Sequence, residues 1–159
     1  MFEKPQAEHE ILQKLVGDWK VLGECSMPDG SSDKSESGVK FTSLGGLWVV
    51  GDGTMPGPEG ADFRTNMTLG FDPVKGRYVG TFIASCMTKL WVYDGNYDAA
   101  SKKLVLDATG PRFDQKPGEA PYKDTIEFVN DDQFILSSQM QGDDGNWFSF
   151  MKSVHHRVK

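Results

Sequence analysis

The chain has 159 residues, of which 38% are apolar, 11% aromatic and 25% charged. This composition is typical of a globular protein, and the length predicts one domain over residues 1–159 whose core needs neither disulfides nor metals. With 17 basic and 23 acidic residues, the formal net charge is −6. An acidic surface repels phosphate backbones and anionic lipid heads, so nucleic acids and membranes are not expected partners.

Targeting signals and cysteines indicate the compartment. The first residues carry neither a basic start nor an apolar run, so no secretory signal is predicted. Apolar runs such as Leu47 to Val50 are far shorter than the roughly 20 residues that span a bilayer. Cys25 and Cys86 lack a C-x-x-C spacing, and in a cytoplasmic protein we expect them to be reduced and buried, with a disulfide between them as the alternative.

Residues 6–16 are predicted to form a short amphipathic helix. Pro5 suits the entry to this helix, and Gly17 suits its exit. A helix of about 11 residues is marginal alone, so we expect it to dock on the rest of the domain. Its apolar residues recur at helical spacing: Ile11, Leu12, Leu15 and Val16.

Beyond Gly17 the hydrophobic period changes to two, which is typical of half-buried strands. Turn signals such as Asp72 to Gly76 and Gly142 to Gly145 separate about ten such runs, and 110–121, with three prolines, is expected to be the longest loop. The pattern predicts an all-β, about ten-stranded antiparallel up-and-down barrel over residues 17–158, with the helix capping one end. Ten strands leave a lumen wide enough for a small ligand.

The motif Gly17-x-Trp19 lies where the predicted helix enters the first strand. With this placement the chain resembles the calycin superfamily, which includes lipocalins and fatty-acid-binding proteins. The resemblance implies that Trp19 packs across the closed end of a calycin-like barrel. It also implies that a basic residue of the last strand, here Arg157, lies over the indole ring.

A closer resemblance covers nearly the whole chain. Six short segments match, in the same order, the bacterial family called domain of unknown function 1579, which the chain therefore resembles. This resemblance implies a calycin-like barrel and no established activity. The family often has an acidic residue in the fifth strand where this chain has Ala84, so a reaction that used that carboxylate would be missing. The matching segments are His9-Glu10-x-Leu12, Gly17-x-Trp19, Leu44-Gly45-Gly46, Gly70-Phe71-Asp72, Tyr78-Val79-Gly80-Thr81 and Gly95-x-Tyr97-Asp98.

No group of residues names a reaction by itself, so an enzyme is not the expected function. The sequence has no nucleophile elbow, phosphate loop or zinc-binding signature, and no metal site is predicted. Asp52, Asp94 and Asp107 fall within predicted strands and would support acid–base chemistry only if they met inside the barrel.

The C-terminal histidines offer a second route to chemistry. His155 and His156 are adjacent on a predicted strand, so they point to opposite faces. If Arg157 points inward, so does His155, which would then be able to bind haem iron or to move protons. Haem is therefore an alternative to the expectation of no cofactor.

Aromatic and methionine side chains dominate the predicted strands, and a mainly apolar pocket is the usual form of a small-molecule site. Strand alternation from Trp19 as an inward anchor places Phe148, Phe150 and Val154 outside, as a dimer contact or a face for helix packing. A single bulge would reverse these faces. The predicted lining residues of the lumen are Val21, Cys25, Tyr78, Phe82, Trp147, Met151, His155 and Arg157.

The sequence therefore predicts a protein that binds a small apolar or amphipathic molecule in the barrel lumen. Arg157 or His155 would orient a polar or anionic end of this ligand. The alternatives are a haem-binding or acid–base barrel enzyme that uses His155 or an inward aspartate, and a protein-interaction or homodimerisation module.

Overall fold

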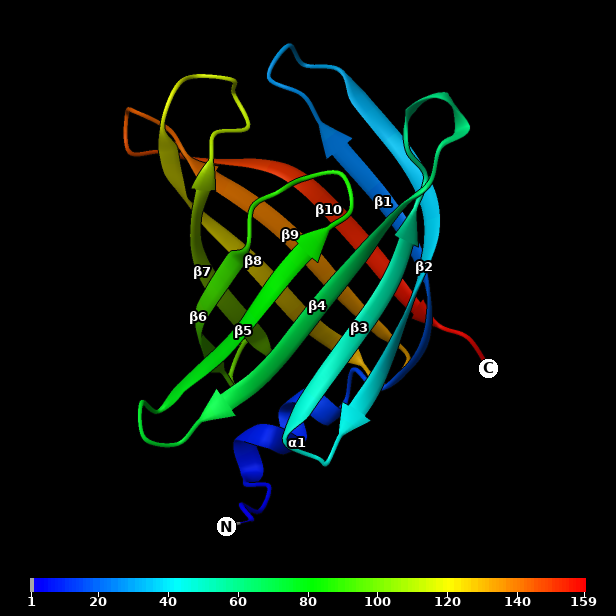
Figure 1. Cartoon of the computed structure of the whole chain (residues 1–159), viewed down its shortest axis with the longest axis vertical. Coiled ribbons are helices and arrows are strands. Elements are labelled where there is room, and N and C mark those ends of the chain that lie inside the picture. Colours follow the sequence, from blue (N-terminus) through cyan, green and yellow to red (C-terminus); the bar gives the residue numbers. More distant parts are fainter. Residues whose placement is uncertain (1) are drawn as a thin grey trace.

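The computed structural model describes residues 2–159, in which ten strands form one closed antiparallel barrel (Figure 1). Each strand pairs with its neighbours in the chain, and the first pairs with the last, so the predicted all-β architecture is confirmed. A short helix, α1 (Ala7–Gln13), precedes the barrel. The strands are β1 (Gly17–Ser26), β2 (Ser32–Leu44), β3 (Trp48–Met55), β4 (Phe63–Asp72), β5 (Arg77–Ala84), β6 (Trp91–Asp98), β7 (Lys103–Pro111), β8 (Glu119–Asn130), β9 (Gln133–Gln141) and β10 (Trp147–Arg157).

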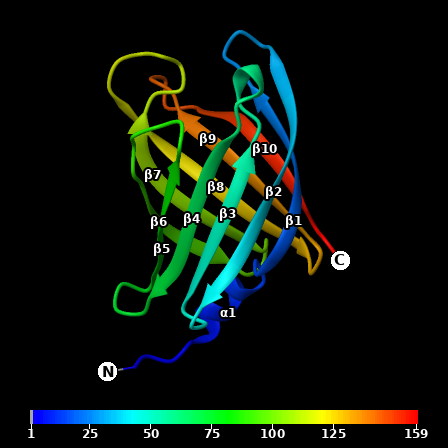
Figure 2. The ribbon, with the colours of Figure 1, turned by 45° about the vertical axis from the view of Figure 1, so that its right-hand side comes forward.

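Helix α1 lies across one end of the barrel, as the amphipathic pattern predicts (Figures 1 and 2). It is shorter than the predicted 6–16 because the chain tightens after Gln13. The amide N–H groups of Leu15 and Val16 donate to carbonyl oxygens three residues earlier, which is the 3₁₀ pattern of a helix end. Leu12 and Leu15 are fully buried, so this segment seals the end that it covers.

The barrel contains two apolar clusters at opposite ends. The larger one joins Leu12 and Leu15 to the strand ends nearest α1, and includes Trp19 and Phe134. The smaller one consists of Ala120, Tyr122 and Met140, with partly buried aromatic side chains packed against it. Its residues lie at the start of β8 and the end of β9, at the end of the barrel opposite α1. The larger cluster extends to Tyr93 and Leu106 in the middle of the barrel, and Ala108 and Leu136 pack against it.

Two strand boundaries differ from the predicted ones. Strand β7 continues to Pro111 and β8 begins at Glu119, so the predicted loop 110–121 shrinks to 112–118. Both strands carry a proline, and Pro121 pairs with Thr109. Proline fits a strand where its missing N–H faces away from the ladder, so these residues do not end the sheet.

Neither cysteine forms a disulfide: Cys25 is half-buried and free, and Cys86 is exposed and free. The predicted burial of Cys86 is therefore wrong, because this residue lies in the connection 85–90 rather than in a strand. Over residues 2–159, no helix has the length and hydropathy needed to cross a membrane.

Candidate functional site

The end of the barrel beside α1 is closed by a basic residue stacked on an indole ring. The guanidinium carbon of Arg157 lies 4.3 Å from the centre of the Trp19 ring. Its nitrogens donate to the backbone carbonyl oxygens of Val16, Lys14 and Asp131 at 2.7, 3.0 and 2.9 Å. All three guanidinium nitrogens are therefore committed to the closed end, away from the middle of the lumen.

Tyr78, another predicted lining residue, also belongs to the closed end. Its side chain is buried, and its hydroxyl donates to the carbonyl oxygen of Glu8 in α1 at 3.1 Å. Burial, followed by the charge of Glu8, raises the pKa of Tyr78 to about 12. Tyr78 and Arg157 thus fasten α1 and the chain that follows it to the barrel.

The opposite mouth is partly covered by the loop 112–118 between β7 and β8 (Figure 1). Phe113 of this loop stacks on Phe150, with ring centroids 4.7 Å apart and 22° between the ring planes. The Phe113 amide donates to the hydroxyl of Tyr122 at 2.9 Å. Trp91 contacts the same tyrosine edge-on, so Trp91, Phe113, Tyr122 and Phe150 form an aromatic collar on the β6 to β10 side of this mouth.

Ion pairs hold this loop against the turn between β9 and β10. Arg112 forms pairs with Asp114 at 2.7 Å and with Asp143 at 2.9 Å. Lys116 reaches the other oxygen of Asp143 at 2.9 Å. The hydrogen bond from Arg112 is the main cause that lowers the pKa of Asp114 to about 2.

Three inward positions in the middle of the barrel are only half-buried. On β8, Asp124 is only half-buried although its inward neighbours Tyr122 and Ile126 are buried. Ala108 on β7 and Leu136 on β9 show the same pattern, each half-buried between two buried inward positions. Half-buried inward positions in the middle of three adjacent strands indicate that side chains do not pack tightly against them from the opposite wall of the barrel.

A polar cluster of Asp124 with the buried Tyr93 and Ser138 lies in this middle section. The Tyr93 hydroxyl donates to Oδ2 of Asp124, and the Ser138 hydroxyl donates to Oδ1, each at 2.5 Å. Burial raises the pKa of Asp124, while these two hydrogen bonds oppose the shift. Burial and the neighbouring carboxyl also raise the pKa of Tyr93, so the tyrosine is a neutral donor at physiological pH.

His155 is the second polar group that faces inward. Its ring stacks on Phe134 with centroids 4.1 Å apart, and only 5% of the residue is exposed. Nδ1 is buried and has no hydrogen-bond partner among the residues that the structure describes. Burial lowers the pKa of His155 to about 4, so the imidazole is neutral near pH 7.

The predicted lining residues separate into three groups. Val21 and His155 pair with each other and are buried inside the barrel. Cys25, Phe82 and Met151 share this inward parity and are half-buried. Tyr78 and Arg157 lie at the closed end, and Trp147 lies outside.

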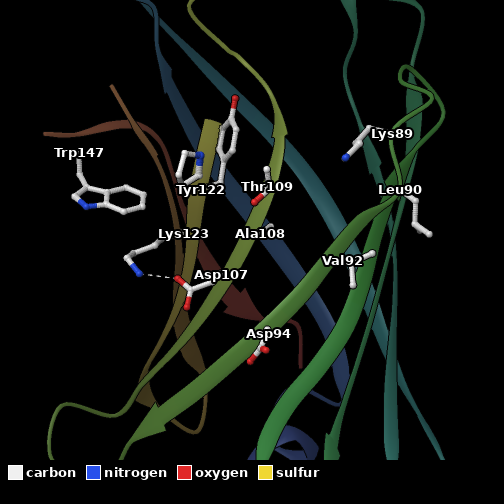
Figure 3. A pocket seen from close by; sticks show the side chains of 11 residues that line it. Lys89, Leu90, Val92, Asp94, Asp107, Ala108, Thr109, Tyr122, Lys123 and Trp147 are labelled. Carbon is white, nitrogen blue, oxygen red and sulfur yellow. Dashed lines mark hydrogen bonds and ion pairs between the residues drawn. The ribbon is translucent and has the colours of Figure 1, made fainter. Parts of the chain in front are cut away.

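The expectation that Trp147 faces the lumen is wrong. Its ring is on the outer face, where Nζ of Lys123 lies 5.0 Å above it and also reaches Asp107 at 2.6 Å (Figure 3). The cause is a bulge in β10 between Ser149 and Met151, which adds one residue and reverses the alternation before it.

The same bulge also changes which residues of β10 face inward. Phe150 packs against Phe113 and Tyr122 at the mouth, so the expectation that it lies outside is wrong. Phe148 pairs with the buried Met140 and also contacts the Phe113 ring, so it shares this inward side. Val154, which follows the bulge, lies on an outer groove beside Leu22, as predicted.

The three aspartates that were candidates for acid–base chemistry do not meet inside the barrel. Asp52 accepts a hydrogen bond from Asn66, Asp94 pairs with Arg77, and Asp107 pairs with Lys123, all on the outer face. Sequence reasoning missed the inward acid, Asp124. A signal existed, because Asp124 falls on the apolar side of the alternation formed by Tyr122, Ile126 and Phe128.

The outer face carries a groove of about 540 Å³ over β6, β7 and β8 (Figure 3). Leu90 and Val92 line one side, and Trp147 lies across from them. Among the described residues, no three His, Cys, Asp or Glu side chains are placed to hold a metal ion together.

Comparison with known proteins identifies a family and a fold. The model of the family described as "Protein of unknown function (DUF1579)" matches residues 4–157. No curated protein matches the sequence.

Solved structures with low sequence identity share the barrel. The crystal structure of Rv2717c from M. tuberculosis is 16% identical with a TM-score of 0.68, and the match covers 98% of this chain and 100% of that one. The S-type phycobiliprotein lyase CPES from Guillardia theta is 14% identical with a TM-score of 0.66, covering 97% and 94%. EF1p2_mFAP2b, solved bound to DFHBI, is 11% identical with a TM-score of 0.50, covering 94% and 98%.

Proposed function

The chain belongs to the DUF1579 family, and we propose that it binds a small, largely apolar molecule in the barrel lumen. The observation that carries the proposal is the row of half-buried residues Ala108, Asp124 and Leu136 between buried neighbours. Unfilled space in a barrel core costs packing energy, and a bound molecule would recover it.

The chemistry of the lumen walls supports the same proposal. Apolar and aromatic side chains form both ends of the space, and two isolated polar sites face it. One is the half-buried carboxyl of Asp124 with its hydroxyl partners, and the other is His155, whose unpartnered Nδ1 is enclosed beside Phe134. A mainly apolar cavity with a few placed polar groups is the usual form of a small-molecule site.

The similar structures make this role reasonable to test. One similar barrel was solved with DFHBI bound, and another is named as a phycobiliprotein lyase. These are properties of those proteins, and their low sequence identity carries only the fold to this chain.

Two adjacent residues of β7 provide a matched test. Ala108 faces the lumen, whereas Thr109 is exposed on the outer face. We expect the neutral apolar probe N-phenyl-1-naphthylamine to gain fluorescence with wild-type protein, and Ala108→Phe to weaken binding at least tenfold by filling the space. Thr109→Phe should bind the probe within twofold of wild type. Equal binding by both variants would place the probe outside the lumen and contradict the proposal.

Native mass spectrometry of the gently purified protein separates the alternatives. An adduct of a few hundred daltons that leaves on denaturation supports the proposal. A haem-sized adduct with a Soret absorption band would replace it with the haem alternative through His155. The same spectrum reports whether the protein is a monomer or a dimer.

A further inference from the structure

We propose that the lumen selects molecules whose polar end is a cation, such as an alkylammonium group, and that Asp124 is the residue that binds it. This inference rests on the proposed lumen function and assigns the ligand's chemical class. It replaces the expectation that Arg157 or His155 would hold an anionic end.

The distribution of charge in the barrel carries the argument. Asp124 has no ion-pair partner among the residues of 2–159, although nine ion pairs are formed elsewhere. Arg157 is held by three carbonyl oxygens at the closed end. Arg112, at the mouth, is held by Asp114 and Asp143. An anionic ligand group in the middle of the lumen would therefore meet a carboxylate, with no free cation beside it among the residues that the structure describes.

The hydrogen bonds of Asp124 favour the ionised form of its carboxyl group, against the effect of burial. Tyr93 and Ser138 each donate to a different oxygen, and hydroxyl donors bind a carboxylate more strongly than a neutral acid. A carboxylate has about four acceptor positions, so each oxygen keeps capacity for another donor. A buried charge without a counter-ion is costly, and an ammonium group with three N–H donors would supply both the charge and the missing hydrogen bonds.

The route to Asp124 favours the same ligand class. Tyr122, its inward neighbour on β8, belongs to the aromatic collar at the mouth, together with Trp91 and Phe113. The negative faces of aromatic rings attract cations. The half-buried inward residues Ala108 and Leu136 provide apolar surface for a hydrocarbon chain. A cation with a short hydrocarbon tail therefore meets complementary groups along this path.

The test compares three probes that share one chain length: n-octylammonium, octanol and octanoate. By isothermal titration calorimetry at pH 7, we expect wild-type protein to bind octylammonium at least tenfold more tightly than octanoate, with octanol between them. Asp124→Asn, which keeps the shape and removes the charge, should reduce this difference to within about twofold. Asp107→Asn removes an outer-face carboxylate and should leave the preference unchanged.

Each outcome is decisive. Octanol or octanoate binding as tightly as octylammonium to wild type would overturn the cation preference and leave lumen binding intact. A preference that survives in Asp124→Asn would overturn the role of Asp124. If none of the three probes binds wild type, the proposed function fails and this inference fails with it. Because the wild-type ordering is measured alone, it tests the cation preference even if Asp124→Asn does not fold; Asp124→Glu, which keeps the charge, should then keep the preference if Asp124 binds the cation.

Discussion

Arg157 and Trp19 face each other across the pairing of the last strand with the first, and the guanidinium carbon lies 4.3 Å from the centre of the indole ring. The indole N–H donates to the carbonyl oxygen of Leu15 at 2.7 Å, while Arg157 donates to the neighbouring carbonyls of Lys14 and Val16. The two side chains together satisfy the backbone where α1 ends and β1 begins. The two residues also join the first strand to the last, so they help to close the barrel wall as well as the end beside α1.

Replacing Arg157 should therefore destabilise the protein without changing the lumen. We expect Arg157→Ala to lower the free energy of unfolding by about 2–3 kcal/mol, because several charge-assisted hydrogen bonds and a cation–π contact are lost. Arg157→Lys should recover less than half, since a single ammonium cannot reach three carbonyls in a forked arrangement. Urea denaturation measures the free energy of unfolding of both variants. Lys152→Ala, an exposed change on the same strand, is the control and should have little effect.

The protonation of His155 makes stability depend on pH. Its folded pKa of about 4 lies below the value of 6.5 for an unperturbed histidine, so the unfolded chain takes up the proton first as the pH falls. The stabilisation is complete above pH 6.5 and is lost as the pH falls towards 4, by at most about 3 kcal/mol.

Two neighbouring histidines allow this pH effect to be isolated. His155→Phe should flatten the fall in unfolding free energy between pH 7 and pH 4.5, because the titrating group is removed and the stacking on Phe134 is kept. His156→Asn, at an exposed position, should retain the wild-type slope. A wild-type slope in His155→Phe would show that another group causes the acid sensitivity.

The two tryptophans Trp91 and Trp147 should differ in their effect on a lumen ligand. Trp91 belongs to the aromatic collar, whereas Trp147 is outside beyond the bulge of β10. We expect Trp91→Ala to change the affinity for N-phenyl-1-naphthylamine at least fivefold, and Trp147→Ala to change it less than twofold. A larger effect of Trp147→Ala would mean that the probe binds in the outer groove.

The ion pairs at the mouth should control exchange rather than affinity. Asp143 holds both Arg112 and Lys116, so Asp143→Asn should loosen the loop that carries Phe113. Asp143 is exposed, and Arg112 keeps its pair with Asp114 in this variant, so we expect no large change in the free energy of unfolding. Stopped-flow fluorescence should show probe association and dissociation both several-fold faster, with an affinity within twofold of wild type.

Asp94→Asn is the matched control for this prediction. It breaks an exposed pair with Arg77 on the outer face, away from the mouth. Its probe kinetics should equal those of wild type. Unchanged kinetics in Asp143→Asn would show that ligand entry does not depend on the loop 112–118.

The sequence by itself determined the number of strands, their order and the helix at one end. Turn residues such as Gly76 and Gly145, both with positive φ, lie between runs of period two, and these are local properties that a sequence displays directly. Family motifs around Trp19 indicated the closed end in the same way. The predicted end of the helix and the predicted limits of the loop between β7 and β8 were less accurate, because backbone hydrogen bonds determine where these elements end.

Only the tertiary structure decided which side chains share the lumen. One extra residue between Ser149 and Met151 sends Trp147 outside and Phe150 inside, and this bulge depends on the pairing of β10 with β9. Tyr93, Asp124 and Ser138 come from three strands and meet only because the barrel closes in this register. Alternation along one strand is local information, whereas the register between strands depends on residues far apart in the chain.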